Sequence, residues 1–277
     1  MSRRSVFLVA LSTAAVGLAS VLASPVSAAH GAVRPGAMTF TEGAQCTANF
    51  VFTDGGGTYI GQAAHCSGLG AAADTNGCDA ASLPLGTPVE IDGARRPGTL
   101  AYSSWLTMQA VGETDPFACA FNDFALVRVH PADVRRVDPS IPALGGPTGL
   151  DRDGVAAGEA VYSYGNSGLR LGISELSPKE GISLGTTADG WTHPVYTLTP
   201  GIPGDSGSAF VNSEGQALGV LSTLSIAPTP LSNGVSDLAR MLDYANRHGG
   251  QSLSLVEGGA FSPGGSRLGG LLGGLLR

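Results

Sequence analysis

Charged residues are scarce in this sequence, and lysine is almost absent. They make up 13% of 277 residues, and Lys179 is the single lysine among fifteen basic residues. With a net charge of −7 and no basic stretch, the chain lacks the electrostatic features of a nucleic-acid-binding protein. Glycine (42) and proline (17) are abundant instead. This mixture favours an all-β protein with many turns over a helical bundle.

The N-terminus reads as an export signal. Arg3 and Arg4 give a basic start, Ser5 to Ala23 carry no charge, and small residues lead to Ala28, after which we expect cleavage. The alternative is an uncleaved membrane anchor, since the apolar run is slightly long for a signal. The break at Ser24-Pro25 favours a signal peptide at residues 1–28. The dominance of arginine over lysine, together with the high glycine and alanine content, indicates a bacterial source. The signal peptide predicts a secreted protein without stable membrane insertion after cleavage.

Cysteine is limited to four residues, and none of them forms a Cys-x-x-Cys pair. The spacing pattern of a zinc site is therefore missing, and we expect no metal. Cysteines of an exported chain pair as disulfides, and four of them allow three connectivities. Cys66 directly follows His65 and Cys46 lies just upstream, which favours a Cys46–Cys66 bridge, and Cys78–Cys119 follows by elimination.

Periodicity predicts many short strands and one helix. The helix begins at Ser236, presents Leu238, Met241 and Leu242 on one face, and ends before Gly249. The predicted strands cover residues 49–53, 58–61, 88–91, 99–102, 124–129, 159–164, 169–173, 194–198, 209–211 and 217–223.

Two other stretches mark the organisation of the chain. Residues 137–154 are rich in proline, glycine and aspartate, which is typical of a linker between two halves. Residues 251–277 are rich in glycine and leucine, and we expect them to form a disordered tail. The folded domain is therefore expected to span residues 29–250.

Three short motifs carry the chemistry. They are Ala63-Ala64-His65-Cys66, Asn122-Asp123-Phe124-Ala125-Leu126-Val127 and Gly204-Asp205-Ser206-Gly207-Ser208. A serine hydroxyl is a poor nucleophile at neutral pH and needs a base within hydrogen-bond reach. Together the motifs supply a base, an orienting carboxylate and a nucleophile in the order His, Asp, Ser.

These motifs resemble those of the chymotrypsin-like (trypsin-like, S1) serine peptidases, particularly their bacterial secreted branch. The resemblance spans residues 40–248 and implies two six-stranded antiparallel β-barrels, at about 38–136 and 155–235, joined by the linker and followed by a helix at 236–248. It implies a secreted endopeptidase, acting on protein or peptide substrates as a monomer and without a cofactor.

The resemblance also assigns the site residues. His65, Asp123 and Ser206 correspond to the catalytic triad, and the backbone N–H groups of Gly204 and Ser206 to the oxyanion hole. The substrate pocket corresponds to Pro200, Ser222, Thr223 and Leu224. Pro200 stands where trypsin-type members carry aspartate, so we expect a small or medium apolar side chain before the cleaved bond.

Two alternative functions have to be weighed. Residues 204–208 also fit the Gly-Asp-Ser-x-Ser motif of GDSL esterases, but those enzymes carry it near the N-terminus, and no Asp-x-x-His follows it here. A non-catalytic binding protein on a peptidase scaffold is the other alternative. Such proteins usually lose a triad residue, and none is lost in this chain.

Asp205 raises a separate question. Many animal members pair the corresponding aspartate with the amino group of a newly cut Ile-Val-Gly-Gly terminus, and this chain has no such motif. A buried carboxylate without a partner is costly, so we expect an internal cation. Arg170 is the first candidate, because a guanidinium stays charged and can bind a carboxylate twice. The alternative reading of Arg170 as a solvated surface residue carries equal weight.

Overall fold

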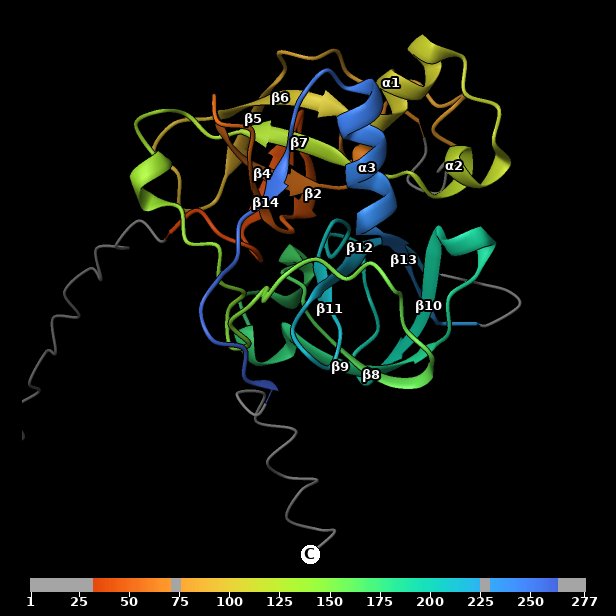
Figure 1. Ribbon diagram of the computed structural model, residues 1–277. Coiled ribbons are helices and arrows are strands. Elements are labelled where there is room, and N and C mark those ends of the chain that lie inside the picture. The colour runs from red at the N-terminus through yellow and green to blue at the C-terminus, as the bar shows by residue number, and fades with distance from the viewer. Residues whose placement is uncertain (1–31, 71–75, 225–229, 264–277) are drawn as a thin grey trace, which may run out of the picture.

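Two antiparallel β units lie one above the other, and a C-terminal helix, α3 (Leu238–His248), crosses their junction (Figure 1). The computed structural model describes residues 32–70, 76–224 and 230–263. The predicted signal peptide lies outside the described residues. Among the residues described, no helix has the length and apolar character needed to cross a membrane.

The N-terminal unit is an antiparallel sheet of eight strands. In spatial order these are β14 (Ser254–Leu255), β3 (Val51–Thr53), β4 (Thr58–Gln62), β7 (Ala125–Arg128), β6 (Gly98–Ser103), β5 (Pro88–Ile91), β1 (Met38–Thr41) and β2 (Ala44–Thr47). β4 and β7 are central, and their register pairs Ile60 with Val127. Both residues are fully buried in the core of this unit.

The C-terminal unit is a closed barrel of six strands. Its order is β10 (Thr192–Thr197), β13 (Asn233–Asp237), β12 (Ala217–Leu224), β11 (Ala209–Val211), β8 (Ala157–Tyr164) and β9 (Pro178–Leu184). Apolar side chains such as Val161, Val195 and Phe210 fill a small core of its own. The expected all-β architecture with a C-terminal helix is confirmed, and so is the second six-stranded barrel; the N-terminal unit differs, since it is an eight-stranded sheet where a six-stranded barrel was expected.

Helix α3 packs against both units, because it contacts α1 (Ser104–Val111) on one side and β12 and β13 on the other. Its cap differs from the expectation. Asp237, the last residue of β13, accepts a hydrogen bond from the backbone N–H of Arg240 at 2.7 Å, whereas Ser236 lies one residue earlier in the strand. Both residue types cap helices well, so only the strand register decides between them. The expected end at Gly249 is confirmed.

Two short helices, α1 and α2 (Pro116–Phe121), interrupt the chain between β6 and β7 and were not predicted. Cys119 of α2 is bonded to Cys78, and Cys46 is bonded to Cys66. Both predicted disulfides are confirmed. The bridge to α2 joins the loop before β5 to the helix that leads into Asp123.

The segment after α3, residues 251–263, is an ordered strap and not part of a disordered tail. It adds β14 to the edge of β3, and Gly146 and Gly259 pair as an isolated bridge at the linker. Phe261 then packs edge-on against Tyr162 of β8, with ring centroids 5.8 Å apart. Glycine-rich composition did not predict these contacts, because they depend on partners distant in the chain. Residues 264–277 lie outside the described residues.

Candidate active site

His65 and the fully buried Asp123 form a pair at the ends of two neighbouring strands. His65 lies in a 3-10 turn, Ala64–Ser67, directly after β4, and Asp123 immediately precedes Phe124 and β7. Because β4 and β7 are neighbours, the two side chains meet. Asp123 accepts from the His65 backbone N–H at 2.8 Å, and its other oxygen lies 2.6 Å from His65 Nδ1.

A third group contacts the same carboxylate. The Ser222 hydroxyl of β12 donates to Asp123 Oδ2 at 2.6 Å, so the carboxylate is held from both β units. Burial alone would raise the pKa of Asp123, but the charge of His65 and these hydrogen bonds lower it below its usual range. Burial opposes the charge of His65, but the Asp123 carboxylate outweighs that effect and raises the pKa of the imidazole.

Ser206 lies in a tight turn that the N-terminal unit holds in place. Its carbonyl accepts from the Thr47 backbone N–H at 2.8 Å. The next residue, Gly207, has φ +88°, and a side chain there would come within 2.5 Å of the Thr47 carbonyl oxygen. Only glycine fits this approach. Since Cys46 precedes Thr47 and is bonded to Cys66, the serine turn and the histidine turn are tied together.

The backbone around Ser206 leaves two N–H groups free. Among the described residues, neither Gly204 N nor Ser206 N donates a hydrogen bond. The carbonyl of Gly204 accepts from Thr47 Oγ1 at 2.7 Å and from Gln45 Nε2 at 3.0 Å. These contacts point the carbonyl toward the N-terminal unit. The two free donors, two residues apart, are the kind of group that stabilises a developing oxyanion.

Ser206 and His65 form no hydrogen bond with each other in the part of the chain that the structure describes. Such bonds are often long before substrate binds. Ser206 is a half-buried residue and the His65 side chain is 11% exposed, so both residues retain access to solvent. The arrangement can therefore admit a reacting group to both.

Asp205 is fully buried and paired with internal cations. Arg170 Nη2 donates to its Oδ2 at 2.5 Å, which confirms the expected partner and excludes a solvated surface role for that arginine. Lys179 Nζ lies 3.0 Å from the same oxygen and was not predicted. The segment 169–173, expected to be a strand, contains instead the 3-10 turn Gly168–Arg170. Ser167 caps that turn, and Leu171 adopts φ +52°, so the backbone cannot run extended.

The four residues expected to form the substrate pocket have different environments. Pro200 and Leu224 are exposed, and Thr223 is half-buried. Ser222 is the exception, because its hydroxyl faces Asp123. Next to Pro200, the Gly201 backbone N–H donates to the Asn233 side chain of β13 at 2.8 Å. No carboxylate is among these residues.

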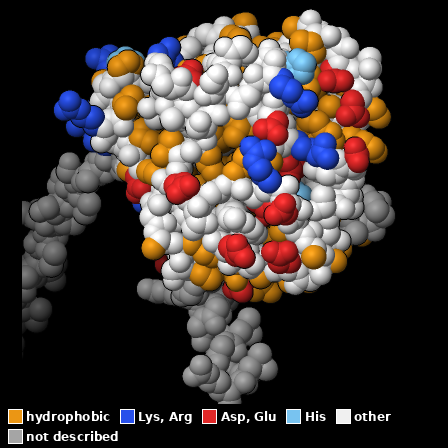
Figure 2. All heavy atoms as spheres, in the orientation of Figure 1, with side chains coloured by type: hydrophobic (Ala, Val, Ile, Leu, Met, Phe, Trp, Pro, Cys, Tyr) orange, Lys and Arg blue, Asp and Glu red, His pale blue; other side chains and the backbone are white. Residues whose placement is uncertain are grey.

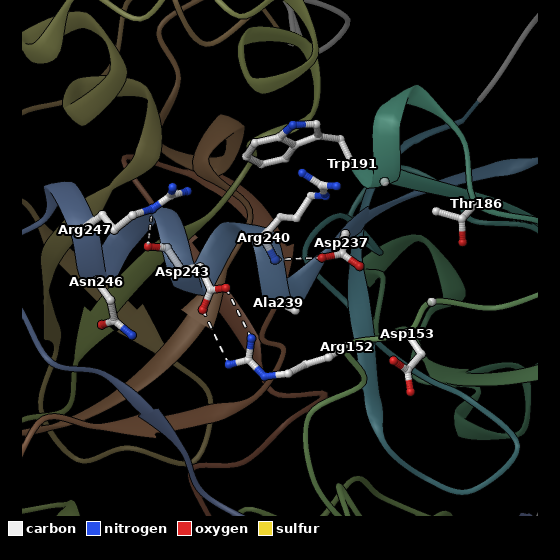
Figure 3. Close-up of a pocket in the computed structure, with 12 residues that line it drawn as sticks. Arg152, Asp153, Thr186, Trp191, Asp237, Ala239, Arg240, Asp243, Asn246 and Arg247 are labelled. Atoms are coloured by element: carbon white, nitrogen blue, oxygen red, sulfur yellow. Dashed lines mark hydrogen bonds and ion pairs between the residues drawn. The ribbon is translucent and has the colours of Figure 1, made fainter.

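A cavity of about 640 Å³ lies elsewhere, between α3 and the C-terminal barrel. Figure 3 shows Arg240 beside Trp191 and Arg152 paired with Asp243 at its rim. None of the candidate site residues lines it. On the face that carries α3, acidic and basic side chains are interspersed (Figure 2). The cavity is thus separate from the candidate active site.

Two further side-chain clusters contain groups that could bind a metal ion or transfer a proton. The ligand atoms of Cys46, His65 and Cys66 lie within 4.8 Å of one another, but the sulfur atoms form a disulfide and are not thiolates. His193, fully buried in β10, bonds Asp237 at 2.9 Å and Thr186 at 3.0 Å. It therefore forms a second histidine–aspartate pair, next to the cap of α3.

Known structures share the arrangement of the two β units. Protease A of Thermobifida fusca matches with a TM-score of 0.52 at 21% identity, over 82% of this chain and 100% of that one. A Glu endopeptidase, solved in complex with MPD, matches with a TM-score of 0.50 at 16% identity, over 82% and 95%. This chain has the chymotrypsin-like fold. No protein-family model matches the sequence, and no curated protein is similar to it in sequence.

In this chymotrypsin-like fold, the candidate residues come from both β units. His65 and Asp123 belong to the N-terminal unit, and Ser206 and Ser222 to the C-terminal one. Sequence reasoning missed the groups that hold them: Gln45, Thr47, Ser167 and Lys179. A threonine such as Thr47 or a serine such as Ser167 gives no signal of its own in the sequence, since its contacts depend on how the two units dock.

Proposed function

We propose that this protein is a secreted serine endopeptidase in which Ser206 is the nucleophile, His65 the base and Asp123 the orienting carboxylate. One observation supports this proposal most strongly. The buried carboxylate of Asp123 fixes Nδ1 of His65, while the turn carrying Ser206 is tied to the histidine turn and leaves two N–H groups free. The two disulfides and the expected signal peptide support export.

The first half of the reaction forms an acyl-enzyme. Ser206 Oγ attacks the carbonyl carbon of the peptide bond while its proton passes to His65 Nε2. The carbonyl π electrons move to the oxygen, where the N–H groups of Gly204 and Ser206 stabilise the negative charge. Each such donor contributes about 10²–10³-fold in turnover. When the carbonyl re-forms, the C–N bond breaks, and His65 returns its proton to the departing amine.

The second half releases the acid. A water molecule takes the place of the amine, and His65 removes its proton as the water oxygen attacks the ester carbon. The bond between that carbon and Ser206 Oγ then breaks, and the proton moves from His65 to the serine oxygen. One water is consumed, and one carboxylic acid and one amine are formed. Asp123 remains ionised throughout and stabilises the imidazolium.

We propose that the pocket accepts a small or medium apolar side chain before the cleaved bond. Pro200, Thr223 and Leu224 carry no charge, and Ser222 is engaged by Asp123. Asp205, which follows the segment that begins at Pro200, is buried and neutralised by Arg170 and Lys179. A basic side chain would lack the buried partner that it needs. The protein is proposed to act as a monomer and without a cofactor.

To test this, the mature protein is incubated with a library of peptides whose N- and C-termini are both blocked. Internal cleavage after apolar residues is expected, with no activity in Ser206→Ala and full activity in Ser174→Ala, an exposed serine. Hydrolysis of esters alone would favour the esterase reading, and no hydrolysis at all would favour a binding protein. Cleavage mainly after arginine or lysine would overturn the pocket assignment.

A further inference from the structure

Lys179, the single lysine of the chain, has a fully buried side chain on β9. Its Nζ has three acceptors: the carbonyl oxygens of Thr199 and Pro200, each at 3.2 Å, and Asp205 Oδ2 at 3.0 Å. An ammonium has three N–H donors and no acceptor. Donors and acceptors therefore match one to one, and no N–H is left over for a ligand.

These acceptors lie at the two ends of the segment 199–205, which directly precedes Ser206. Thr199 and Pro200 begin the stretch proposed to line the substrate pocket, and Asp205 ends it. Asp205 also accepts from the Ile202 backbone N–H, at 3.1 Å. The Lys179 ammonium thus fixes both ends of the segment 199–205. This segment includes Gly204, whose N–H is one of the two free donors beside Ser206. A shift of this segment would move the pocket wall and that N–H together.

The charge of the cluster argues against Lys179 as a mere partner for Asp205. Arg170 already neutralises the carboxylate, so Arg170, Lys179 and Asp205 together carry a net charge of +1. Burying a second cation costs free energy that a one-to-one pair would not. Lys179 differs from Arg170 in its two carbonyl contacts with residues 199–200, whereas Arg170 Nε donates to the Leu176 carbonyl.

We propose that Lys179 is a positioning residue for the peptide hydrolysis proposed above: its ammonium holds residues 199–200 and Asp205 in the arrangement that the reaction needs. The inference rests on the proposed function. It also predicts a loss of activity at alkaline pH. A neutral amine has only two N–H donors, so deprotonation removes one of the three hydrogen bonds by which Lys179 holds this segment.

The surroundings of Lys179 set the direction of this titration. Burial lowers the pKa of the lysine below its ordinary value of 10.5; Asp205 opposes this shift, and Arg170 adds to it. These are the charged groups that face Lys179 among the described residues. The activity that depends on the ammonium is therefore present below the lowered pKa and is lost as the pH rises through it.

The experiment compares kcat/KM of the full mature protein with that of Lys179→Met and Lys179→Arg across neutral and alkaline pH. Lys179→Met leaves the neutral Arg170–Asp205 pair, and we expect it to fold. Its kcat/KM should fall about 10- to 100-fold at neutral pH, because a small displacement of reacting groups has effects of this size. Its alkaline limb should disappear. Lys179→Arg should recover part of the activity without an alkaline limb, since arginine stays protonated.

The matched control is Arg128→Met, which also removes a cation bonded to a backbone carbonyl, that of Gly56, but on the exposed side of β7. It should retain full activity and the alkaline limb. An unchanged pH profile in a folded Lys179 variant, or no alkaline limb in the wild type, overturns the inference and leaves the peptidase proposal intact. If the wild type hydrolyses no peptide and Ser206 does not react, the proposed function fails and the positioning role falls with it.

Discussion

Ser222→Ala separates a substrate contact from a contact within the site. The sequence places Ser222 in the substrate pocket, whereas its hydroxyl donates to the buried Asp123 carboxylate at 2.6 Å. If the hydroxyl acts on the carboxylate, its removal lowers both the free energy of unfolding and kcat. If it acts on substrate, its removal changes KM and leaves the free energy of unfolding unchanged.

The size of the effect follows from the charge and burial of Asp123. A hydrogen bond to a charged group contributes about 1.5–3 kcal/mol, and Asp123 is fully buried, so water cannot replace the lost donor. For a domain of this size, that loss lowers the melting temperature by about 3–12 °C. Since the folded-state pKa of Asp123 is lowered, this stabilisation is present above pH 3.8 and is lost as pH falls through the folded-state pKa.

The assay is thermal unfolding of wild type and Ser222→Ala at neutral and acid pH, together with kcat and KM on one peptide. We expect the two proteins to differ most at neutral pH and to converge in acid. Ser213→Ala is the control, because that hydroxyl also faces a carboxylate, Glu159 at 3.3 Å, but is exposed. A changed KM with unaltered melting temperature and kcat would refute the assignment of Ser222 to Asp123.

Three further outcomes are expected. Because Asp123 raises the pKa of His65 above 6.5, kcat/KM should fall as the pH drops through that pKa. In Asp123→Asn, the remaining activity should fall at a lower pH than in the wild type. Since Asp205 already has internal cations, a tag fused ahead of Ala29 should leave peptide hydrolysis unchanged; activity only after trimming would contradict this. Phe261→Ala should reduce the free energy of unfolding in urea by about 1–3 kcal/mol, because the strap loses its contact with Tyr162.

The motifs predicted the elements of the site better than the contacts between them. His65, Asp123 and the cysteine pairs depend on residues that local sequence marks clearly, and β5 and β11 have the predicted bounds. The role of Ser222 depends on how β12 docks against the N-terminal unit. Nothing local to β12 carries that information, so the serine was assigned to the pocket by its neighbours.

The other differences have the same origin. Nothing in the residues beside Lys179 indicates that it is buried, and only the closed barrel reveals it. Residues 251–263 read as low complexity, yet their backbone pairs with β3 and with the linker. The apolar run at 169–173 reads as a strand, but Leu169 and Leu171 are exposed and Arg170 turns inward to Asp205.

The most direct test of the central claim is the intact mass of the mature protein after treatment with a fluorophosphonate. If His65 activates Ser206, the wild type gains a single adduct on Ser206, Ser206→Ala gains none, and His65→Ala reacts orders of magnitude more slowly. Labelling of another residue, or equal labelling rates in wild type and His65→Ala, would contradict the account.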